Sequence, residues 1–445
     1  MPSTTIGGDF VWPQQIPPEA PVTYRPAMRL TLLLALMMSL VTPTAAQAST
    51  CAPVIVPGAE HVEQSCLDDL TTTGTSRTGH TVQADWAGLT SAGFPVVSAV
   101  PGVQVDGYFP DSSKTNTAHG WNHDSQFVLR LPTRWNGGLV VSGSPGVRRQ
   151  YANDRAIADQ VLAAGYAFAA TDKGNTGADF FTDGRAPGDA LAEWNTRVTQ
   201  LTLAAKLTAK LHYGRFPART IAAGISNGGY LVRWQLENVP WLYDGGVDWE
   251  GTLWRPDGDN LLTFLPPAIR GDRDEIVAAG FDPASEFLWP YHKQVYWDLT
   301  QRIYRTELDP GYEGNDADYD YVSRPKSVHR AVARISLTGR IGKPLLTLHG
   351  TLDALLPISR DSDVYHRMIA TQGRAHLQRY YRIEGGNHVD GLYDTYPDLL
   401  RPIGPCFTTA FTALEGWLRG IQPPPSATLA RPTGTDLATS CSLTA

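Results

Sequence analysis

Cysteine is scarce in this chain, whose 445 residues include only four. No two of them form a C-x-x-C pair, so the sequence indicates neither a zinc site nor a dithiol redox centre. Sequence alone does not choose among the possible pairings. Closeness along the chain favours one disulfide between Cys51 and Cys66 and another between Cys406 and Cys441.

Clusters of basic residues are also missing. The chain has 37 Lys and Arg against 44 Asp and Glu, a net charge of −7, and no block of positive residues stands out. A nucleic-acid partner requires such a positive patch, so we expect none. Hydrophobic residues make up 42% of the chain, which is enough for a large globular core. The composition does not indicate an oligomeric state.

The apolar run at 32–41 is too short to span a membrane, which takes about 20 residues. Arg29 precedes this run, and the A-x-A sequence Ala46-Gln47-Ala48 follows it. This pattern is typical of a secretory signal peptide. We therefore expect a pre-sequence at 1–48, with a translation start at Met28, a mature chain from near Ser49, and secretion without stable membrane insertion. A retained signal anchor is the alternative.

Strand-like and helix-like segments alternate through most of the remaining chain. The expected strands are 103–109, 125–131, 138–142, 165–171, 220–223, 343–348 and 376–382. The expected helices are 155–164, 191–212, 228–237 and 361–371. This alternation is typical of a mostly parallel central sheet with helices on both faces. The sequence therefore predicts an α/β protein whose core has two parts, 49–240 and 331–420.

An aromatic-rich segment separates these two parts. Residues 241–321 contain 15 Phe, Trp and Tyr, a much higher share than the 10% of the whole chain. We interpret 241–330 as an insertion that forms a lid, and an ordinary run of helices packed on the core is the alternative. Residues 421–445 are rich in Pro and Thr, which predicts an extended C-terminal tail on the surface.

Residues 224–228 read Gly-Ile-Ser-Asn-Gly, a G-x-S-x-G motif. The motif follows an expected strand and opens an expected helix, which is the context of a nucleophile elbow. The tight turn requires small flanking residues, and Gly224, Gly228 and Gly229 satisfy that requirement. The helix N-terminus also favours developing negative charge. The motif predicts Ser226 as a nucleophile, and a glycine-rich turn with a capping serine is the alternative.

A serine nucleophile needs a base, and in the α/β-hydrolase fold the chain order is Ser, then Asp or Glu, then His. Asp353 follows the expected strand 343–348, and His388 follows the strand 376–382. The sequence predicts that His388 takes the Ser226 proton, while Asp353 fixes the imidazole tautomer and stabilises the imidazolium.

Other acidic residues could replace Asp353 in this arrangement. Asp248 and Glu250 follow a possible strand at 243–247, so either could be the acid. Asp390 lies two residues after His388 and is a weaker alternative. Of two further histidines, His349 is interpreted as a structural residue and His366 as a surface residue.

Acyl transfer also needs hydrogen-bond donors for an oxyanion. One donor in this fold is the backbone N–H of the residue after the nucleophile, here Asn227. The other comes from the loop after an earlier core strand, here Ser-Gly-Ser-Pro-Gly at 142–146. Pro145 has no N–H, so Ser144 is expected to be the second donor, with a simple β-turn as the alternative.

Three carboxylates alternate at Asp316, Asp318 and Asp320. Clustered carboxylates can bind Ca²⁺. An EF-hand is excluded, because Tyr321 stands where that loop needs glycine and Ser327 where it needs glutamate. The three aspartates are weak candidates for a structural calcium site, with a solvated acidic loop as the alternative. No other cofactor is indicated.

With these motifs, residues 138–389 resemble the secreted tannase and feruloyl esterase family. The resemblance lies in the elbow 224–229, the aromatic-rich insertion, the acidic stretch 316–320 and the strand-plus-acid segment 344–353. It implies an α/β-hydrolase with a lid, hydrolysis of phenolic esters, and the triad of Ser226, Asp353 and His388, and it favours calcium in the lid. That family usually has cysteines where this chain has Ile225 and Val389.

A second resemblance, to secreted 3-hydroxybutyrate oligomer hydrolases, lies in residues 165–174 and 226–229. Both resemblances imply the same chemistry on different acyl groups. We expect a secreted serine carboxylic-ester hydrolase acting on a small-molecule or polymer-linked phenolic ester, since the aromatic insertion can pack flat rings. A 3-hydroxybutyrate oligomer or other polyester is the alternative substrate. A secreted exopeptidase that uses Asp248 and Glu250 to bind an amino group, and a binding module with an inactive elbow, are the remaining hypotheses.

Overall fold

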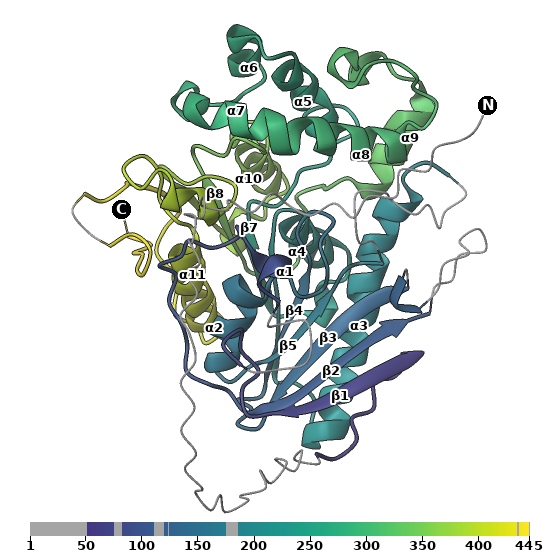
Figure 1. Ribbon diagram of the computed structural model, residues 1–445, viewed down its shortest axis with the longest axis vertical. Helices are drawn as coiled ribbons and strands as arrows, with labels where there is room; N and C mark the ends of the chain where they lie inside the picture. Colours follow the sequence, from purple (N-terminus) through teal and green to yellow (C-terminus); the bar gives the residue numbers. More distant parts are fainter. Residues whose placement is uncertain are drawn as a thin grey trace, which may run out of the picture. The chain divides into compact units, whose positions relative to one another are not determined.

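The computed structural model describes residues 51–74, 82–110, 120–122, 124–174, 186–433 and 436–444. The predicted pre-sequence at 1–48 lies outside these residues. A sheet of ten strands runs through the described chain in the order β1-β2-β3-β5-β4-β6-β7-β8-β9-β10 (Figure 1). The strands are β1 (His61–Leu67), β2 (Gly102–Phe109), β3 (Ser125–Pro132), β4 (Gly138–Gly143), β5 (Ala167–Thr171), β6 (Arg219–Ile225), β7 (Gly245–Trp249), β8 (Leu345–Gly350), β9 (Gln378–Ile383) and β10 (Ala427–Leu429).

Pairing in this sheet changes from antiparallel to parallel at β5. The strands β1, β2, β3 and β5 pair antiparallel, whereas every pair from β5 to β10 is parallel. The mostly parallel sheet predicted from the strand–helix alternation is therefore confirmed. Because parallel strands end at one edge, the loops after β4, β5, β6, β7, β8 and β9 lie along the same side of the sheet.

Helices cover both faces of the sheet because its strands are apolar on both sides. In β4, Val140 belongs to the apolar cluster with α2 and α11, whereas Leu139 and Val141 belong to the cluster with α3 and α4. Burying one such side chain contributes about 1.5–3 kcal/mol. The helices that pack on the sheet or close to it are α1 (Gln83–Trp86), α2 (Asp159–Ala163), α3 (Asp189–Tyr213), α4 (Asn227–Asn238), α10 (Ser362–Thr371) and α11 (Gly404–Trp417).

Between β7 and β8 the chain leaves the sheet and forms a group of helices, at the top of Figure 1. Aromatic side chains of this segment, among them Trp254, Trp297 and Tyr304, are buried in the same apolar cluster as α3 and α4. Among the described residues, no helix is both long and apolar enough to cross a membrane. The helices are α5 (Leu261–Arg270), α6 (Arg273–Ala278), α7 (Trp289–His292), α8 (Asp298–Leu308) and α9 (Lys326–Ile335).

The strand β7 lies within the range 241–330 that the aromatic enrichment predicts as an insertion. It pairs with β6 on one side and β8 on the other, so the chain leaves the sheet only after Trp249. Tyr243 and Trp249 contribute to the aromatic count, yet both are buried core residues. Aromatic density therefore marks the insertion but does not locate its first residue.

The C-terminal residues differ from the expected surface tail. Ala427–Leu429 form β10, which pairs parallel to β9, and Leu437 and Leu443 are buried. A disulfide joins Cys441 to Cys406 on α11. The other predicted disulfide, between the two remaining cysteines, is also present, so both pairings are confirmed: Cys51 with Cys66 and Cys406 with Cys441.

Candidate active site

Ser226 lies at the turn between β6 and α4 with a φ of 58°. The only other positive φ values among described non-glycine residues belong to Lys173 and Glu250. A Cβ on Gly224 would lie 2.3 Å from the backbone of Gly228, so this turn accepts no side chain there. Left-handed backbone at a non-glycine residue costs about 1–3 kcal/mol and gathers at functional sites. The turn has the local geometry expected of a nucleophile elbow.

The three residues predicted as a triad are in hydrogen-bond contact. His388 Nε2 lies 3.0 Å from Ser226 Oγ, and His388 Nδ1 lies 2.8 Å from Asp353 Oδ2. They follow β9, β6 and β8, whose carboxyl ends share one edge of the sheet. Since a carboxylate accepts only, Nδ1 carries the proton that it donates to Asp353. Nε2 is then free to accept the Ser226 hydroxyl proton.

Asp353 is held as a carboxylate. Its Oδ1 accepts from the N–H groups of Leu355 (2.7 Å) and Leu356 (2.8 Å). Burial raises the pKa of Asp353, but attraction to His388 and hydrogen bonds from His349 and His388 outweigh it and hold that pKa well below its usual range. The carboxylate can therefore stabilise a positive imidazolium at neutral pH.

His349, interpreted from the sequence as structural, lies beside Asp353 and supports it. Its Nε2 donates to the carbonyl of Leu356 at 2.9 Å and lies 3.2 Å from Asp353 Oδ2, and its Nδ1 is 2.7 Å from Ser362 Oγ. That hydroxyl accepts from Arg233 Nη2 at 2.7 Å. This buried chain of contacts links α4, β8 and α10 to Asp353. No sequence spacing indicates it, because the residues come from separate elements.

Two of the alternative acids are engaged elsewhere. Asp248 pairs with Arg233 at 2.6 Å and accepts from the N–H of Gly251 at 2.8 Å. Asp390 accepts from two backbone N–H groups at the start of α11, and burial raises its pKa to about 7. Both carboxyl groups therefore stabilise the fold through these contacts.

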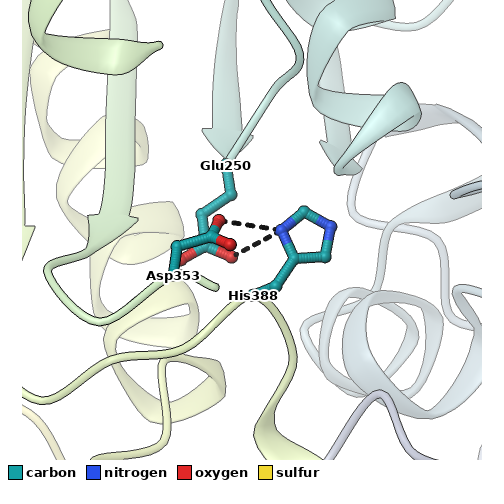
Figure 2. Close-up of side chains that lie close together, drawn as sticks. All are labelled: Glu250, Asp353 and His388. Carbon is teal, nitrogen blue, oxygen red and sulfur yellow. Dashed lines mark hydrogen bonds and ion pairs between the residues drawn. The ribbon is translucent and has the colours of Figure 1, made fainter. Parts of the chain in front are cut away.

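Glu250, the third alternative, does approach His388. Its Oε2 lies 3.5 Å from Nδ1, against 2.8 Å for Asp353 Oδ2, and Figure 2 shows both carboxyl groups at the same ring nitrogen. Burial and the charge of Asp353 raise the pKa of Glu250 well above its usual value. The shorter contact and the ionised state both favour Asp353 as the acid. The three groups also offer atoms within 4.8 Å of one another to a cation, but Nδ1 is already hydrogen-bonded to Asp353.

Ser144 is not available as an oxyanion donor, so this prediction is wrong. Its N–H donates to the carbonyl of Thr171 at 3.0 Å, which extends the contact between β4 and β5 by one residue. Its hydroxyl donates to the carbonyl of Arg148 at 2.8 Å. Asn227, the other predicted donor, is the first residue of α4, where the backbone N–H has no acceptor inside the helix.

Lys173, which sequence reasoning missed, is completely buried behind the Ser144 loop. Its Nζ lies 2.5 Å from Ser144 Oγ, 3.0 Å from Ser144 O and 3.3 Å from Gly146 O. Burial lowers the pKa of Lys173 to about 7. Its sequence context, a polar turn after a strand, does not distinguish it from other turn residues.

The side chain of Asn227 connects the elbow to its surroundings. Its Nδ2 lies 3.2 Å from Gly146 O and 2.5 Å from the Tyr304 hydroxyl on α8. The Tyr304 ring is 5.3 Å from the Trp254 ring, centroid to centroid. Aromatic side chains that follow β7 are therefore next to the nucleophile turn.

The three alternating aspartates do not converge on a common point. Asp316 pairs with Arg305 at 2.8 Å, and Asp320 accepts from the N–H of Val322 at 3.1 Å. In the described part of the chain, the one group of three potential ligands close enough to share a cation is that of Glu250, Asp353 and His388. Asp316, Asp318 and Asp320 therefore do not form a three-carboxylate cluster, and calcium binding at 316–320 stays a prediction.

No protein-family model matches the chain, and neither does the sequence of any curated protein. Its structure is similar to that of feruloyl esterase B from Aspergillus oryzae, with a TM-score of 0.57 and 13% identity over 83% of this chain and 89% of that chain. An esterase from Aspergillus oryzae has a TM-score of 0.54 and 13% identity over 83% and 88%. Tannin acyl hydrolase from Aspergillus niger has a TM-score of 0.47 and 13% identity over 81% and 82%. The predicted resemblance is confirmed at the level of the fold: the chain has the α/β-hydrolase fold of the two Aspergillus oryzae enzymes.

Proposed function

We propose that this protein is a serine carboxylic-ester hydrolase that forms an acyl-enzyme on Ser226. The observation that carries the proposal is the line of contacts from Asp353 Oδ2 through His388 to Ser226 Oγ, at 2.8 and 3.0 Å. The esterases that share its fold support the same reaction class. Asp353 and His388 are the acid and the base of this proposal.

The geometry accounts for both halves of the reaction. Ser226 Oγ attacks the ester carbonyl carbon while its proton passes to His388 Nε2, and Asp353 stabilises the imidazolium. The C–O bond to the alcohol then breaks, and the alcohol leaves with the proton from Nε2. Water next gives a proton to Nε2 and attacks the acyl carbon. The bond to Ser226 breaks, Oγ regains the proton, and the acid is released.

The oxyanion of each tetrahedral intermediate needs backbone donors. We assign the N–H of Asn227 as one of them. The N–H of Gly146 is assigned as the second, because Ser144 is engaged and Pro145 has none. The Gly146 carbonyl accepts from Asn227 Nδ2 at 3.2 Å and Lys173 Nζ at 3.3 Å, which holds Gly146 beside the elbow.

A Lys173→Met variant should lower kcat by about 10- to 100-fold. This loss in kcat is no larger than the loss caused by removing one oxyanion donor. Methionine is unbranched and one atom shorter than lysine, and it cannot donate to Ser144 and Gly146, so the loop loses its position. Steady-state kinetics should show this effect in kcat with little change in KM. The matched control is Lys206→Met, because Lys206 on α3 donates to a single carbonyl, that of Leu242. Equal effects of the two substitutions would contradict the assignment.

For the substrate we propose a small-molecule or polymer-linked ester of a phenolic acid, of the feruloyl or galloyl type. The pairing of Trp254 with Tyr304, and the contact of Tyr304 with Asn227, support an aromatic acyl site beside the nucleophile. Flat side chains can orient a phenolic ring by stacking. In this proposal, the helices between β7 and β8 form the lid.

We also propose that the protein is secreted. Two disulfides account for all four cysteines of the chain. Disulfides persist in oxidising compartments and are rare in the cytosol. Their presence supports export, in agreement with the signal peptide predicted within residues 1–48.

A rate comparison tests the substrate class. Purified protein should hydrolyse methyl ferulate or methyl gallate about 100-fold faster, in kcat/KM, than a 3-hydroxybutyrate dimer or an aminoacyl anilide, a preference of about 2.7 kcal/mol. Preference for the hydroxybutyrate dimer would overturn the phenolic assignment and keep ester hydrolysis. Preference for the anilide would favour the exopeptidase hypothesis, although Asp248 and Glu250 are both completely buried.

A further inference from the structure

Glu250, at the end of β7, is completely buried beside the proposed triad. Its φ is 50°, a left-handed conformation that residues with a side chain seldom adopt. Its Oε1 accepts from the N–H of Gly350 at 2.7 Å. By hydrogen-bond geometry its Oε2 has no partner within the described residues, and it lies 3.5 Å from His388 Nδ1. The side chain of the neighbouring Trp249 also approaches this carboxyl and opposes the rise of its pKa.

A structural role alone does not account for these features. Binding the Gly350 N–H uses one oxygen, and a glutamine could supply that oxygen equally well. A buried polar atom without a partner destabilises the folded state by about 1–3 kcal/mol. A left-handed non-glycine residue destabilises it by a further amount of about 1–3 kcal/mol. Such features gather at functional sites, and the group that Oε2 approaches is the imidazole of His388.

The charges explain why Glu250 is not the acid of the intact site. Two carboxylates beside one imidazole repel each other, so one of them tends to stay protonated. Burial and the negative charge of Asp353, with a smaller effect of Asp390, raise the pKa of Glu250 well above its usual value. Loss of the charge on Asp353 removes its repulsion of an ionised Glu250, which is larger than the repulsion from Asp390. A small side-chain movement then brings Oε2 from 3.5 Å to hydrogen-bond distance from His388 Nδ1.

We propose that Glu250 is a positioning residue for His388. It is a second acid, which accepts the hydrogen bond from His388 Nδ1–H when residue 353 carries no negative charge. This inference rests on the proposed function, because it takes His388 as the base. The topology provides the arrangement: β7 and β8 are parallel neighbours, and each is followed by a carboxyl group that reaches the same ring nitrogen. Figure 2 shows the two groups converging on that atom.

A double-mutant cycle on a phenolic ester tests the inference. The variants are Asp353→Asn, Glu250→Gln and the two combined, with Ser226→Ala as the reference for lost catalysis. Asparagine at 353 keeps an oxygen for the N–H groups of Leu355 and Leu356, so the fold should persist. Asp353→Ala, with and without Glu250→Gln, provides a second series if the asparagine variant melts early. The matched control in the Asp353→Asn background is Glu313→Gln, at an exposed glutamate.

We expect Asp353→Asn to lower kcat by no more than about 100-fold, whereas loss of the acid alone typically costs about 10⁴. Glu250→Gln should then lower kcat at least tenfold more in the Asp353→Asn background than in the wild type, with KM unchanged, and Glu313→Gln should not. Equal factors in both backgrounds, or an Asp353→Asn variant already as inactive as Ser226→Ala, would overturn the role of Glu250. Near wild-type activity of Ser226→Ala would instead overturn the proposed function itself.

Discussion

Replacing Ser226 with alanine should lower kcat by about four to six orders of magnitude and leave the protein folded. The substitution removes only the hydroxyl group, whose oxygen forms the acyl bond in the proposed mechanism. Ser226 Oγ makes its side-chain hydrogen bond to His388 at 3.0 Å, so little packing is lost. Kinetics on a phenolic ester measure the effect, and circular dichroism melting checks the fold.

Covalent labelling provides an independent measurement of the same residue. A fluorophosphonate probe should modify one serine per chain in the wild type, and peptide mapping should place it at Ser226. The Ser226→Ala variant should not react, whereas Ser442→Ala, at an exposed serine, should react like the wild type. Labelling of another serine, or residual turnover near the wild-type rate, would rule out Ser226 as the nucleophile.

Replacing His388 with glutamine should have nearly as large an effect, a loss of about four to six orders of magnitude in kcat. Glutamine cannot accept the Ser226 proton at neutral pH, and its amide cannot become the cation that Asp353 stabilises. The reaction with fluorophosphonate should slow for the same reason, because the serine loses its base. The matched control is His376→Gln, at an exposed histidine, which should keep the wild-type rate.

The two substitutions should not be additive. Residues that act as one catalytic unit lose almost the whole benefit when any member is removed. The Ser226→Ala/His388→Gln double variant should therefore be no slower than Ser226→Ala by more than about threefold. Effects that multiply would show that His388 acts independently of Ser226.

Local sequence was sufficient for the parts of this site that depend on short stretches of chain. The elbow is a tight turn in which consecutive residues decide sterically what fits, and a Cβ on Gly224 would lie 2.3 Å from Gly228. Asp353 and His388 could be named because each follows a strand of a parallel sheet. The structure brings both of them into hydrogen-bond contact in the order expected for this fold.

Other features required residues that are far apart in the sequence. Ser144 lost its expected role because its N–H donates to Thr171 on the neighbouring strand, a contact that spacing along the chain does not reveal. Lys173 was identified only from the structure, because its Nζ contacts the Ser144 loop from the end of another strand, β5. Aromatic density predicted the insertion but set its start at 241, before the possible strand 243–247. That this strand belongs to the sheet as β7 depends on its pairing with β6 and β8.

The choice between Glu250 and Asp353 illustrates the limit most clearly. Both follow a strand and both come before His388, so the chain order allows either. A difference of 2.8 against 3.5 Å at one ring nitrogen, and the mutual repulsion of two buried carboxyls, make Asp353 the ionised partner. Steric rules of a turn act between neighbours in the chain and can be read from it. Electrostatic energies depend on distance and burial, and these exist only once the strands are side by side.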